Sequence, residues 1–588
     1  MTTLHVLPLF VCIAGFLQGA APLPMAVFPE KPVLVQLRDD SLLALFLQTV
    51  DGVQEVSAQQ SKDLGVTWTE RQTLLGLDKD TGIWNLPLAF AGRDGALHLF
   101  FLNDGRTPAV IADEATRPRT GRLWDRHLDI WHTKTAGGLD QWTPPAKIWE
   151  GYTGALNSVI QMKSGRILLP FSFVTRRTWA SRGEGLDAFT YRGQFDSTLV
   201  YSDDEGATWQ LSPADLKVPV PDIVSAYGAV EPVVLELADG RVWMLVRTQQ
   251  GRFYESFSTD GAAWSTPRPS PIVSSDSPGG IVRTTDGRIV LLWNNCLRFP
   301  YAYGGRQVLH AAVSSDEGLT WRGYREVARD SLRNEPPPPR GDHGTAYPFP
   351  VALSNGRVAF ATGQGEAARI ACMVLEPDWL LETRLSDDFS NGLDAWSVFG
   401  TQGAGLLPHP RNASAHVLGV QKIDKDWPAC AVWNFPAGSK GTLRLKLQMP
   451  PMAQGILIGL TDHFSVPFDE EDVFNNVFNL RIGPRGEIAG SPSALDPHTW
   501  HTLAFTWDCA AGTCAVTLDG VEAATLRAQR NSVSLSYFRV KSVAGASMPL
   551  LFAEGRTVNP EETDAAPLLI ESVEVNTEDE RPLSGEHP

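Results

Sequence analysis

Between residues 26 and 380 the chain alternates short polar turns with apolar runs of strand length, in six similar copies. The copies are RDDSLLALF (38–46), GRDGALHLFF (92–101), KSGRILLPF (163–171), ADGRVWMLV (238–246), TDGRIVLLW (285–293) and SNGRVAFAT (354–362). Each reads as a β-hairpin, and long helical periodicity is absent between them. Radial repetition of four-stranded sheets protects strand edges. The pattern therefore predicts an all-β fold with a six-bladed β-propeller over residues 26–382.

A second repeat interleaves with the first and supplies tight turns. It occurs as SKDLGVTW (61–68), SDDEGATW (202–209), STDGAAW (258–264) and SSDEGLTW (314–321), with a worn fifth copy at 133–142. The aspartate is suited to accept hydrogen bonds from backbone N–H groups, the glycine to adopt positive φ, and the tryptophan to pack against neighbouring strands. Repeats of this kind indicate one structural unit used several times.

From about residue 386 the repeats stop, and alternating strands follow between Gly, Asp and Pro turns. This pattern predicts a β-sandwich over residues 386–576, followed by a disordered tail at 577–588. The stretch WHTLAFTWDCAAGTCAVTLDG (500–520) resembles laminin-G or concanavalin-like jelly rolls. In an oxidising compartment we expect a hairpin disulfide between Cys509 and Cys514.

The N-terminus and the charge bear on where the protein acts. An apolar run near residues 7–22 is too short to span a bilayer and ends in small residues, so we expect a signal peptide over residues 1–21 and a secreted or periplasmic protein. The formal net charge of −17 argues against nucleic acid as a partner. No later segment has the length and hydrophobicity for membrane insertion.

Candidate site residues follow from the repeat itself. In a propeller the residue that opens each inner strand faces the central channel, and it lies about nine residues before the turn glycine. The positions found this way are Glu30 or Lys31, Asn85, Asn157, Glu231, Ser277 and Tyr347, and the ends of the next strands add Asp51, Arg247 and Glu366. Glu231 and Arg247 bracket one hairpin, EPVVLELADGRVWMLVR, and so return to the same rim.

The SxDxGxTW boxes resemble the Asp-boxes, or BNR repeats, of the sialidase superfamily. That resemblance implies a six-bladed propeller and an exo-α-sialidase-like glycoside hydrolase. It assigns Tyr347 as nucleophile, Glu231 as its base and Asp51 as acid/base. Arg247 and Arg306 would bind a substrate carboxylate, and Glu366 occupies an acidic position after the tyrosine. A phenol needs a nearby carboxylate to take its proton at neutral pH.

One departure concerns the first arginine of the family's carboxylate-binding triad. Where relatives begin with Arg-Ile-Pro, this chain reads FPEKPVLVQL and places Glu30 at the arginine position. A carboxylate there repels the carboxylate of sialic acid. Lys31, Arg106, Arg176 or Arg177 remain as alternative cations, and the sugar and its linkage stay open.

Two other functions compete with hydrolysis. The propeller would bind a glycan without catalysis, or it would be a polysaccharide lyase in which Tyr347 acts as base and acid and Arg247 neutralises a uronate. The sequence contains no dinucleotide, phosphate-loop or HExxH motif, and its 12 histidines show no zinc-ligand spacing. We therefore expect no cofactor and no metal, and a glycan or glycoconjugate as the partner. The oligomeric state stays open.

Overall fold

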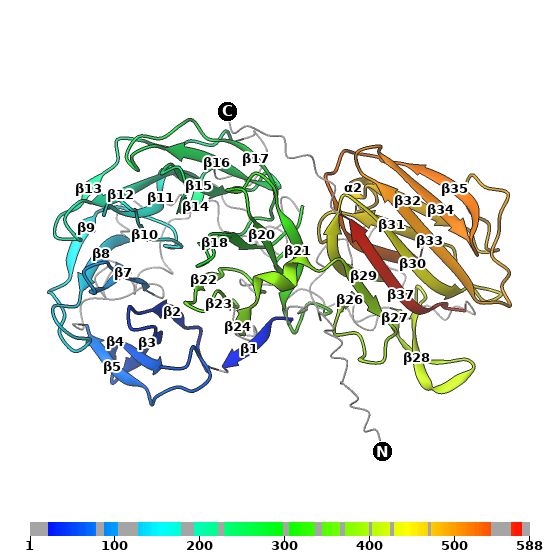
Figure 1. Cartoon of the computed structure of the whole chain (residues 1–588), viewed down its shortest axis with the longest axis horizontal. Coiled ribbons are helices and arrows are strands. Elements are labelled where there is room, and N and C mark those ends of the chain that lie inside the picture. The colour runs from blue at the N-terminus through cyan, green and yellow to red at the C-terminus, as the bar shows by residue number, and fades with distance from the viewer. Residues whose placement is uncertain are drawn as a thin grey trace, which may run out of the picture.

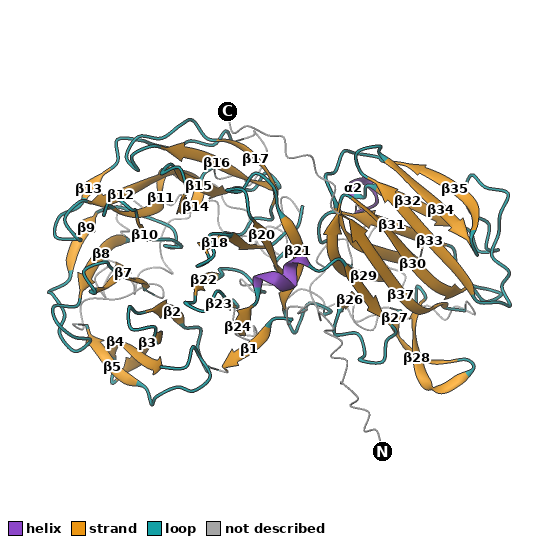
Figure 2. Ribbon diagram, in the orientation of Figure 1, coloured by secondary structure: helices purple, strands orange, loops and turns teal. Residues whose placement is uncertain are grey.

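The computed structural model describes residues 21–26, 28–77, 87–103, 128–177, 193–220, 228–297, 305–335, 344–364, 371–398, 403–423, 429–467, 472–542 and 566–578. Strands dominate these residues (Figure 2). No helix among them has the length and apolar character needed to cross a membrane. The expected signal peptide, except Ala21, and three candidate residues, Asn85, Arg106 and Glu366, lie outside this part of the chain.

The chain from β1 to β24 forms six antiparallel sheets of four strands each, arranged in a ring (Figure 1). The first three sheets are β2 (Val33–Gln36), β3 (Leu42–Val50), β4 (Val53–Ser61) and β5 (Gln72–Gly76); β6 (Leu88–Ala91), β7 (Leu97–Asn103), β8 (Asp129–Lys134) and β9 (Ala146–Trp149); and β10 (Ile160–Gln161), β11 (Ile167–Arg177), β12 (Gly193–Ser202) and β13 (Gln210–Leu211). The next two are β14 (Val230–Glu236), β15 (Val242–Arg247), β16 (Arg252–Ser258) and β17 (Arg268–Val273); and β18 (Gly280–Arg283), β19 (Ile289–Trp293), β20 (Val308–Ser314) and β21 (Arg322–Arg329). All six predicted hairpins connect the first two strands of a sheet.

The sixth sheet joins the two ends of the ring. It contains β22 (Phe349–Ala352), β23 (Val358–Thr362), β24 (Ala371–Leu375) and, at its outer edge, β1 (Leu23–Ala26). Leu23 pairs with Val374 in antiparallel register. The sequence pattern did not predict β1, because four residues carry too little periodicity to identify a strand.

The Asp-boxes form turns between strands, as predicted, and these turns join the third and fourth strands of their sheets. In the first box, Asp63 Oδ1 accepts hydrogen bonds from the backbone N–H groups of Val66 and Thr67, at 3.1 and 2.8 Å. Gly65 has a φ of 95°, and Trp68 donates its indole N–H to the Gly65 carbonyl at 3.1 Å. In this box the hydrogen bonds satisfy the turn locally.

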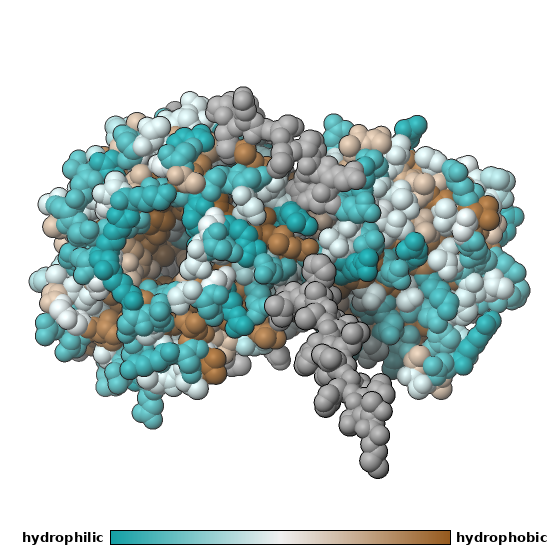
Figure 3. Space-filling view, in the orientation of Figure 1, coloured by the Kyte–Doolittle hydropathy of each residue, from teal (hydrophilic) through white to brown (hydrophobic). Residues whose placement is uncertain are grey.

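A cavity of about 540 Å³ runs through the middle of the ring. The inner strands β2, β6, β10, β14, β18 and β22 all contribute to its wall. Figure 3 shows the ring hollowed at its centre, with apolar residues at depth and polar residues around the edge. The inner strand of every sheet therefore faces a shared central space.

A 3-10 helix (Pro377–Leu381) leads from the ring to a second region, which we call the double sheet (384–578). Its eight-stranded sheet contains β25 (Arg384–Asp387), β27 (Ala404–His409), β28 (Asn412–Val420), β30 (Lys440–Gln448), β33 (His501–Asp508), β34 (Thr513–Leu518), β35 (Val521–Arg527) and β37 (Leu568–Glu578). Its five-stranded sheet contains β26 (Trp396–Val398), β29 (Cys430–Gly438), β31 (Ile456–Thr461), β32 (Phe478–Ile482) and β36 (Leu535–Ser542), and α2 (Asp472–Asn475) lies between β31 and β32 in the chain. Apolar residues of both sheets share one core.

Two expectations about the double sheet are corrected. The predicted tail begins two residues too early, because β37 continues to Glu578, which pairs with Lys440. The disulfide prediction is wrong: Cys509 and Cys514 are both free thiols. Cys514 pairs with Trp507 across the two strands, and Cys509 comes two residues after Trp507. Such diagonal positions are about 7–8 Å apart, which is too far for a disulfide.

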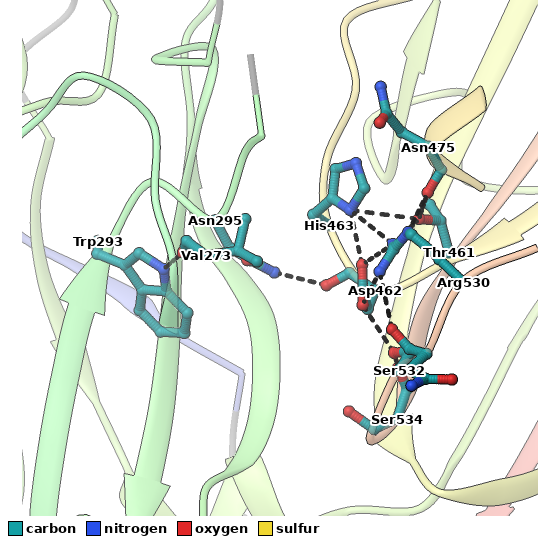
Figure 4. A network of polar contacts seen from close by, with 11 residues as sticks. Val273, Trp293, Asn295, Thr461, Asp462, His463, Asn475, Arg530, Ser532 and Ser534 are labelled. Carbon is teal, nitrogen blue, oxygen red and sulfur yellow. Dashed lines mark hydrogen bonds and ion pairs between the residues drawn. The ribbon is translucent and has the colours of Figure 1, made fainter. Parts of the chain in front are cut away.

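A buried polar network joins the ring to the double sheet (Figure 4). Asn295 donates from its side chain to the Asp462 carbonyl at 2.8 Å and accepts the Phe464 N–H, also at 2.8 Å. The Asp462 carboxylate is held by His463, Arg530 and Ser532. Burial works against ionisation of this carboxylate, but hydrogen bonds from His463 and Arg530 hold the pKa of Asp462 well below its usual range. The two regions therefore meet through fixed, satisfied polar contacts.

Candidate functional site

Tyr347 and Glu231 lie together at one edge of the ring, as the repeat offsets predicted. The Tyr347 hydroxyl donates a hydrogen bond to Glu231 Oε1 at 3.0 Å. Glu231 opens β14 and is 6% exposed, and Tyr347 lies two residues before β22. The two residues come from different sheets, so the contact depends on the ring arrangement.

Both residues have an unusual backbone. Glu231 has a φ of 49° and Tyr347 a φ of 56°. Positive φ is uncommon for residues with bulky side chains and collects at functional sites, where the surrounding structure imposes it. At Glu231 the pairing of β14 with β15 also shifts register, between Val230 and Val233. Such a bulge redirects a side chain, here towards the tyrosine.

Arg247 connects the pair to a second carboxylate. It ends β15, opposite Val230, and its Nη1 donates to Glu231 Oε2 and, at 3.1 Å, to the Tyr347 hydroxyl. Its Nε donates to Asp276 Oδ1 at 2.8 Å. Arg247 is 7% and Asp276 5% exposed. This buried guanidinium therefore holds two carboxylates and the phenol through hydrogen bonds from one side chain.

Arg306 lies near the tyrosine ring, with its guanidinium carbon 5.7 Å from the ring centre. Its Nη2 donates to the Asp276 carbonyl at 2.7 Å, and its Nη1 donates to Gln364 Oε1 at 2.8 Å. The structure therefore brings Tyr347, Glu231, Arg247 and Arg306 together.

Lys31 has a structural role at this edge. Its ammonium group donates to three carbonyls, those of Tyr347 at 2.7 Å, Gly363 at 3.3 Å and Ala346 at 3.4 Å. An ammonium group has three N–H donors, so these bonds occupy all of them. Lys31 fixes the backbone of the tyrosine and does not replace the expected triad arginine.

The environment of Lys31 predicts a pH dependence of stability. Burial lowers the pKa of Lys31 from its ordinary value of 10.5 to about 7. Between these values the unfolded chain binds more protons than the folded chain, so the Lys31 contribution to stability increases with pH. We expect the urea midpoint of Lys31→Met to rise less between about pH 7 and 9 than that of the wild type. Exposed Lys62→Met is the control, and parallel profiles for wild type and Lys31→Met would refute the assignment.

Glu30 and Asp51 lie nearer the surface of the same edge. The Glu30 carboxylate accepts a hydrogen bond from Arg71 Nη1 at 2.9 Å and is 47% exposed. Asp51 is exposed in the turn between β3 and β4. It follows the second strand of the first sheet, as Arg247 ends the second strand of the fourth sheet. Neither residue is brought into the Tyr347 hydrogen-bond network by a contact that the structure records.

Asn157 faces the central cavity and is 8% exposed. Its Nδ2 makes a long 3.4 Å contact with the Ala155 carbonyl, and its Oδ1 has no partner in the described part of the chain. Tyr347 and Glu231 do not line this cavity, whereas Phe349, two residues after the tyrosine, does. The candidate site thus lies at the edge of the central space.

Sequence reasoning missed Asp276, Gln249 and Gln364, which complete the network. Gln249 donates to Asp276 Oδ2 at 3.1 Å. The repeat offset selected Ser277, and Asp276 directly precedes it in the sequence. An uncertainty of one residue in the strand start was enough to select the wrong side chain.

The arrangement is suited to nucleophilic catalysis by a phenol. Glu231 is placed to accept the phenolic proton, and the Arg247 charge stabilises negative charge on the oxygen. The group contains one tyrosine, two carboxylates and two arginines. Such a set binds anions and sugars rather than a transition metal, which prefers imidazole or thiolate ligands.

The family model described as "BNR repeat-like domain" matches residues 77–360 of the chain. No curated protein matches this chain.

Among solved structures, a protein of unknown function from Dyadobacter fermentans is similar at 17% identity, covering 61% of this chain and 98% of that one, with a TM-score of 0.44. The Trypanosoma rangeli sialidase in complex with 2,3-difluorosialic acid is similar at 12% identity, covering 93% and 91%, with a TM-score of 0.39. The NanB sialidase from Streptococcus pneumoniae is similar at 13% identity, covering 62% and 70%, also with a TM-score of 0.39. The matched family model identifies a BNR repeat-like region within the ring.

Proposed function

We propose that this protein is a sialidase-like glycoside hydrolase that removes a terminal sugar through a tyrosine nucleophile. The observation that carries the proposal is the 3.0 Å hydrogen bond between the Tyr347 hydroxyl and Glu231, with Arg247 in contact with both. The BNR repeat-like match over residues 77–360 supports it. We further propose that the ring is a six-bladed β-propeller and the double sheet a concanavalin-like jelly roll. Export through the signal peptide of residues 1–21 belongs to the same proposal.

In the proposed reaction, the Tyr347 oxygen attacks the anomeric carbon while Glu231 accepts the phenolic proton. The bond from the anomeric carbon to the leaving oxygen breaks, and that oxygen takes a proton from an acid, for which we propose Asp51. Water then attacks the anomeric carbon and gives a proton to the Asp51 carboxylate. The bond between this carbon and the Tyr347 oxygen breaks, and the released phenolate recovers its proton from Glu231. Two displacements retain the anomeric configuration.

The two arginines favour a sugar with an anionic or strongly hydrogen-bonding group. Arg247 already contacts Glu231 and Asp276, so a sugar carboxylate has to compete with two protein carboxylates for this guanidinium. The ion pair with Arg71 reduces the repulsion expected from Glu30, but it does not supply a third binding arginine. We therefore propose a terminal sugar as the substrate class without assigning sialic acid.

A panel of aryl glycosides, including an aryl sialoside, tests the proposal. We expect hydrolysis of at least one member with retention of the anomeric configuration, which proton NMR of the first-formed sugar reports. Binding of sugars without turnover of any member would favour the glycan-binding alternative. An unsaturated uronate product from a uronic-acid polymer would instead identify a lyase.

Glu30→Arg separates sialic acid from other substrates in the same assay. The variant removes a carboxylate and adds a cation at the same edge of the ring, so the KM for the sialoside should fall while the KM for neutral glycosides stays the same. An unchanged sialoside KM would show that Glu30 does not face the sugar.

A further inference from the structure

A buried histidine between the second and third sheets lacks a hydrogen bond at one nitrogen. His98, in β7, is 0% exposed, and its Nε2 has no hydrogen-bond partner among the described residues. Its Nδ1 lies 3.0 Å from Nε2 of His132. The ring stacks on Phe90, with the ring centres 4.8 Å apart, which fixes its orientation. A buried imidazole nitrogen without a hydrogen-bond partner costs free energy. We therefore infer that His98 Nε2 faces the place of a missing ligand.

Two carboxylates lie near this histidine, and Asp94 Oδ1 is 4.0 Å from its Nε2. Asp94 comes from the turn between β6 and β7, and Glu205 from the Asp-box between β12 and β13. One ligand atom from each of Asp94, His98 and Glu205 lies within 4.8 Å of the others. Glu205 is held in place by Gln161, which donates to its Oε2 at 2.8 Å. The neighbouring Gly206 packs so closely on the imidazoles that an added Cβ would lie 2.9 Å from His132.

The ligand chemistry selects the kind of cation. Ca²⁺ and Mg²⁺ take oxygen ligands, whereas an imidazole with carboxylates suits Zn²⁺. With Nε2 as the ligand, Nδ1–H donates to His132, and this contact orients the ring in the way that metal-bound histidines require.

Lys134 is the competing cation. Its ammonium group lies 3.5 Å from Asp94 Oδ2 and donates to the Glu205 carbonyl at 2.7 Å. Since the Lys134 side chain is 22% and the Asp94 side chain 32% exposed, the ammonium has a path to solvent and a metal ion has a path inward.

We propose that Asp94, His98 and Glu205 form a zinc-binding site that ties the second sheet of the ring to the third. The site lies at the edge where the first and second strands of each sheet are joined by turns, whereas Glu231, Arg247 and Tyr347 lie at the opposite edge. The ion would stabilise the ring and take no part in the reaction proposed above. No zinc-ligand spacing is visible in the sequence, because Asp94 and Glu205 come from different sheets.

Calorimetric titration of the metal-free protein with ZnCl₂ tests the site. We expect saturable binding, a higher melting temperature with zinc, and no comparable effect of CaCl₂. Asp94→Asn and Glu205→Gln should each raise the zinc Kd at least about tenfold. Lys134→Met should lower the Kd, because the competing charge is gone. This opposite sign is not expected from general destabilisation.

Glu317→Gln is the matched control, because Glu317 occupies the same box position as Glu205 but contacts Arg283 instead of a histidine. Its zinc Kd should equal that of the wild type. An anomalous difference peak beside His98 Nε2 in zinc-soaked crystals would support the site independently of the variants. Absence of zinc binding, or equal Kd values for wild type, Asp94→Asn and Glu205→Gln, would overturn the proposal.

Discussion

Tyr347→Phe is expected to lower glycoside turnover by about 10³-fold or more while leaving the folded protein intact. The change removes the oxygen proposed to attack the sugar, and no other described side chain takes the place of a phenol in contact with Glu231. The aromatic ring and its contacts with Lys31 and Arg306 remain. Loss of the hydroxyl costs about 1 kcal/mol of stability. Steady-state kinetics on the best aryl glycoside and thermal unfolding measure the two effects.

Tyr537→Phe provides the matched control. Tyr537 also donates to a glutamate, with its hydroxyl 2.8 Å from Glu326 Oε1, but it lies in the buried contact between ring and double sheet. Its removal should affect stability and leave kcat unchanged. Similar kcat values for Tyr347→Phe and wild type would argue that the tyrosine binds rather than reacts.

Trp321→Ala is expected to reduce the free energy of unfolding by about 3–5 kcal/mol, the range for deletion of a large buried aromatic side chain. Trp321 closes the Asp-box of the fifth sheet and is 4% exposed. Its ring centre lies 6.3 Å from that of Trp243 in the neighbouring fourth sheet, and its indole N–H donates to the Gly318 carbonyl at 3.1 Å. The substitution therefore removes contacts between sheets as well as within the turn. Urea unfolding followed by circular dichroism measures the loss.

Trp264→Ala serves as the comparison at the same box position. Trp264 is only partly buried, and its indole N–H has no hydrogen-bond partner in the described chain. We expect a smaller loss than for Trp321→Ala. A Trp321→Ala midpoint equal to that of the wild type would mean that the boxes do not hold adjacent sheets together.

The sheets and boxes were predictable because their signals are local. Each Asp-box places its aspartate, glycine and tryptophan within a few residues, and the same hydrogen bond recurs. The Thr67 backbone N–H donates to Asp63 Oδ1 at 2.8 Å, and the Thr208 N–H donates to Asp204 Oδ1 at 2.8 Å. The rim positions of Glu231 and Tyr347 followed from counting along the same repeats. Alternation and turn chemistry suffice for this level of structure.

Contacts between sheets were not predictable from these signals. The hydrogen bonds from Arg247 to Asp276 and from Arg306 to Gln364 join residues of neighbouring sheets, whose relative positions depend on how whole sheets pack. The disulfide prediction failed for a related reason, since it used the spacing of two cysteines and not the strand register. A shift of one residue in register changes every side-chain partner along a strand.

The pairing of β1 with β24 has a consequence for biogenesis. The outer edge of the last sheet is supplied by the first strand, so the ring stays open during synthesis until β24 has left the ribosome. Until then β1 and β23 both lack the strand that lies between them, and such unpaired edges are sites for aggregation. The entropic cost of bringing such distant segments together grows only slowly with the length between them. Because Leu23 begins β1, truncation or fusion only a few residues beyond position 21 would remove or crowd the strand that completes the ring.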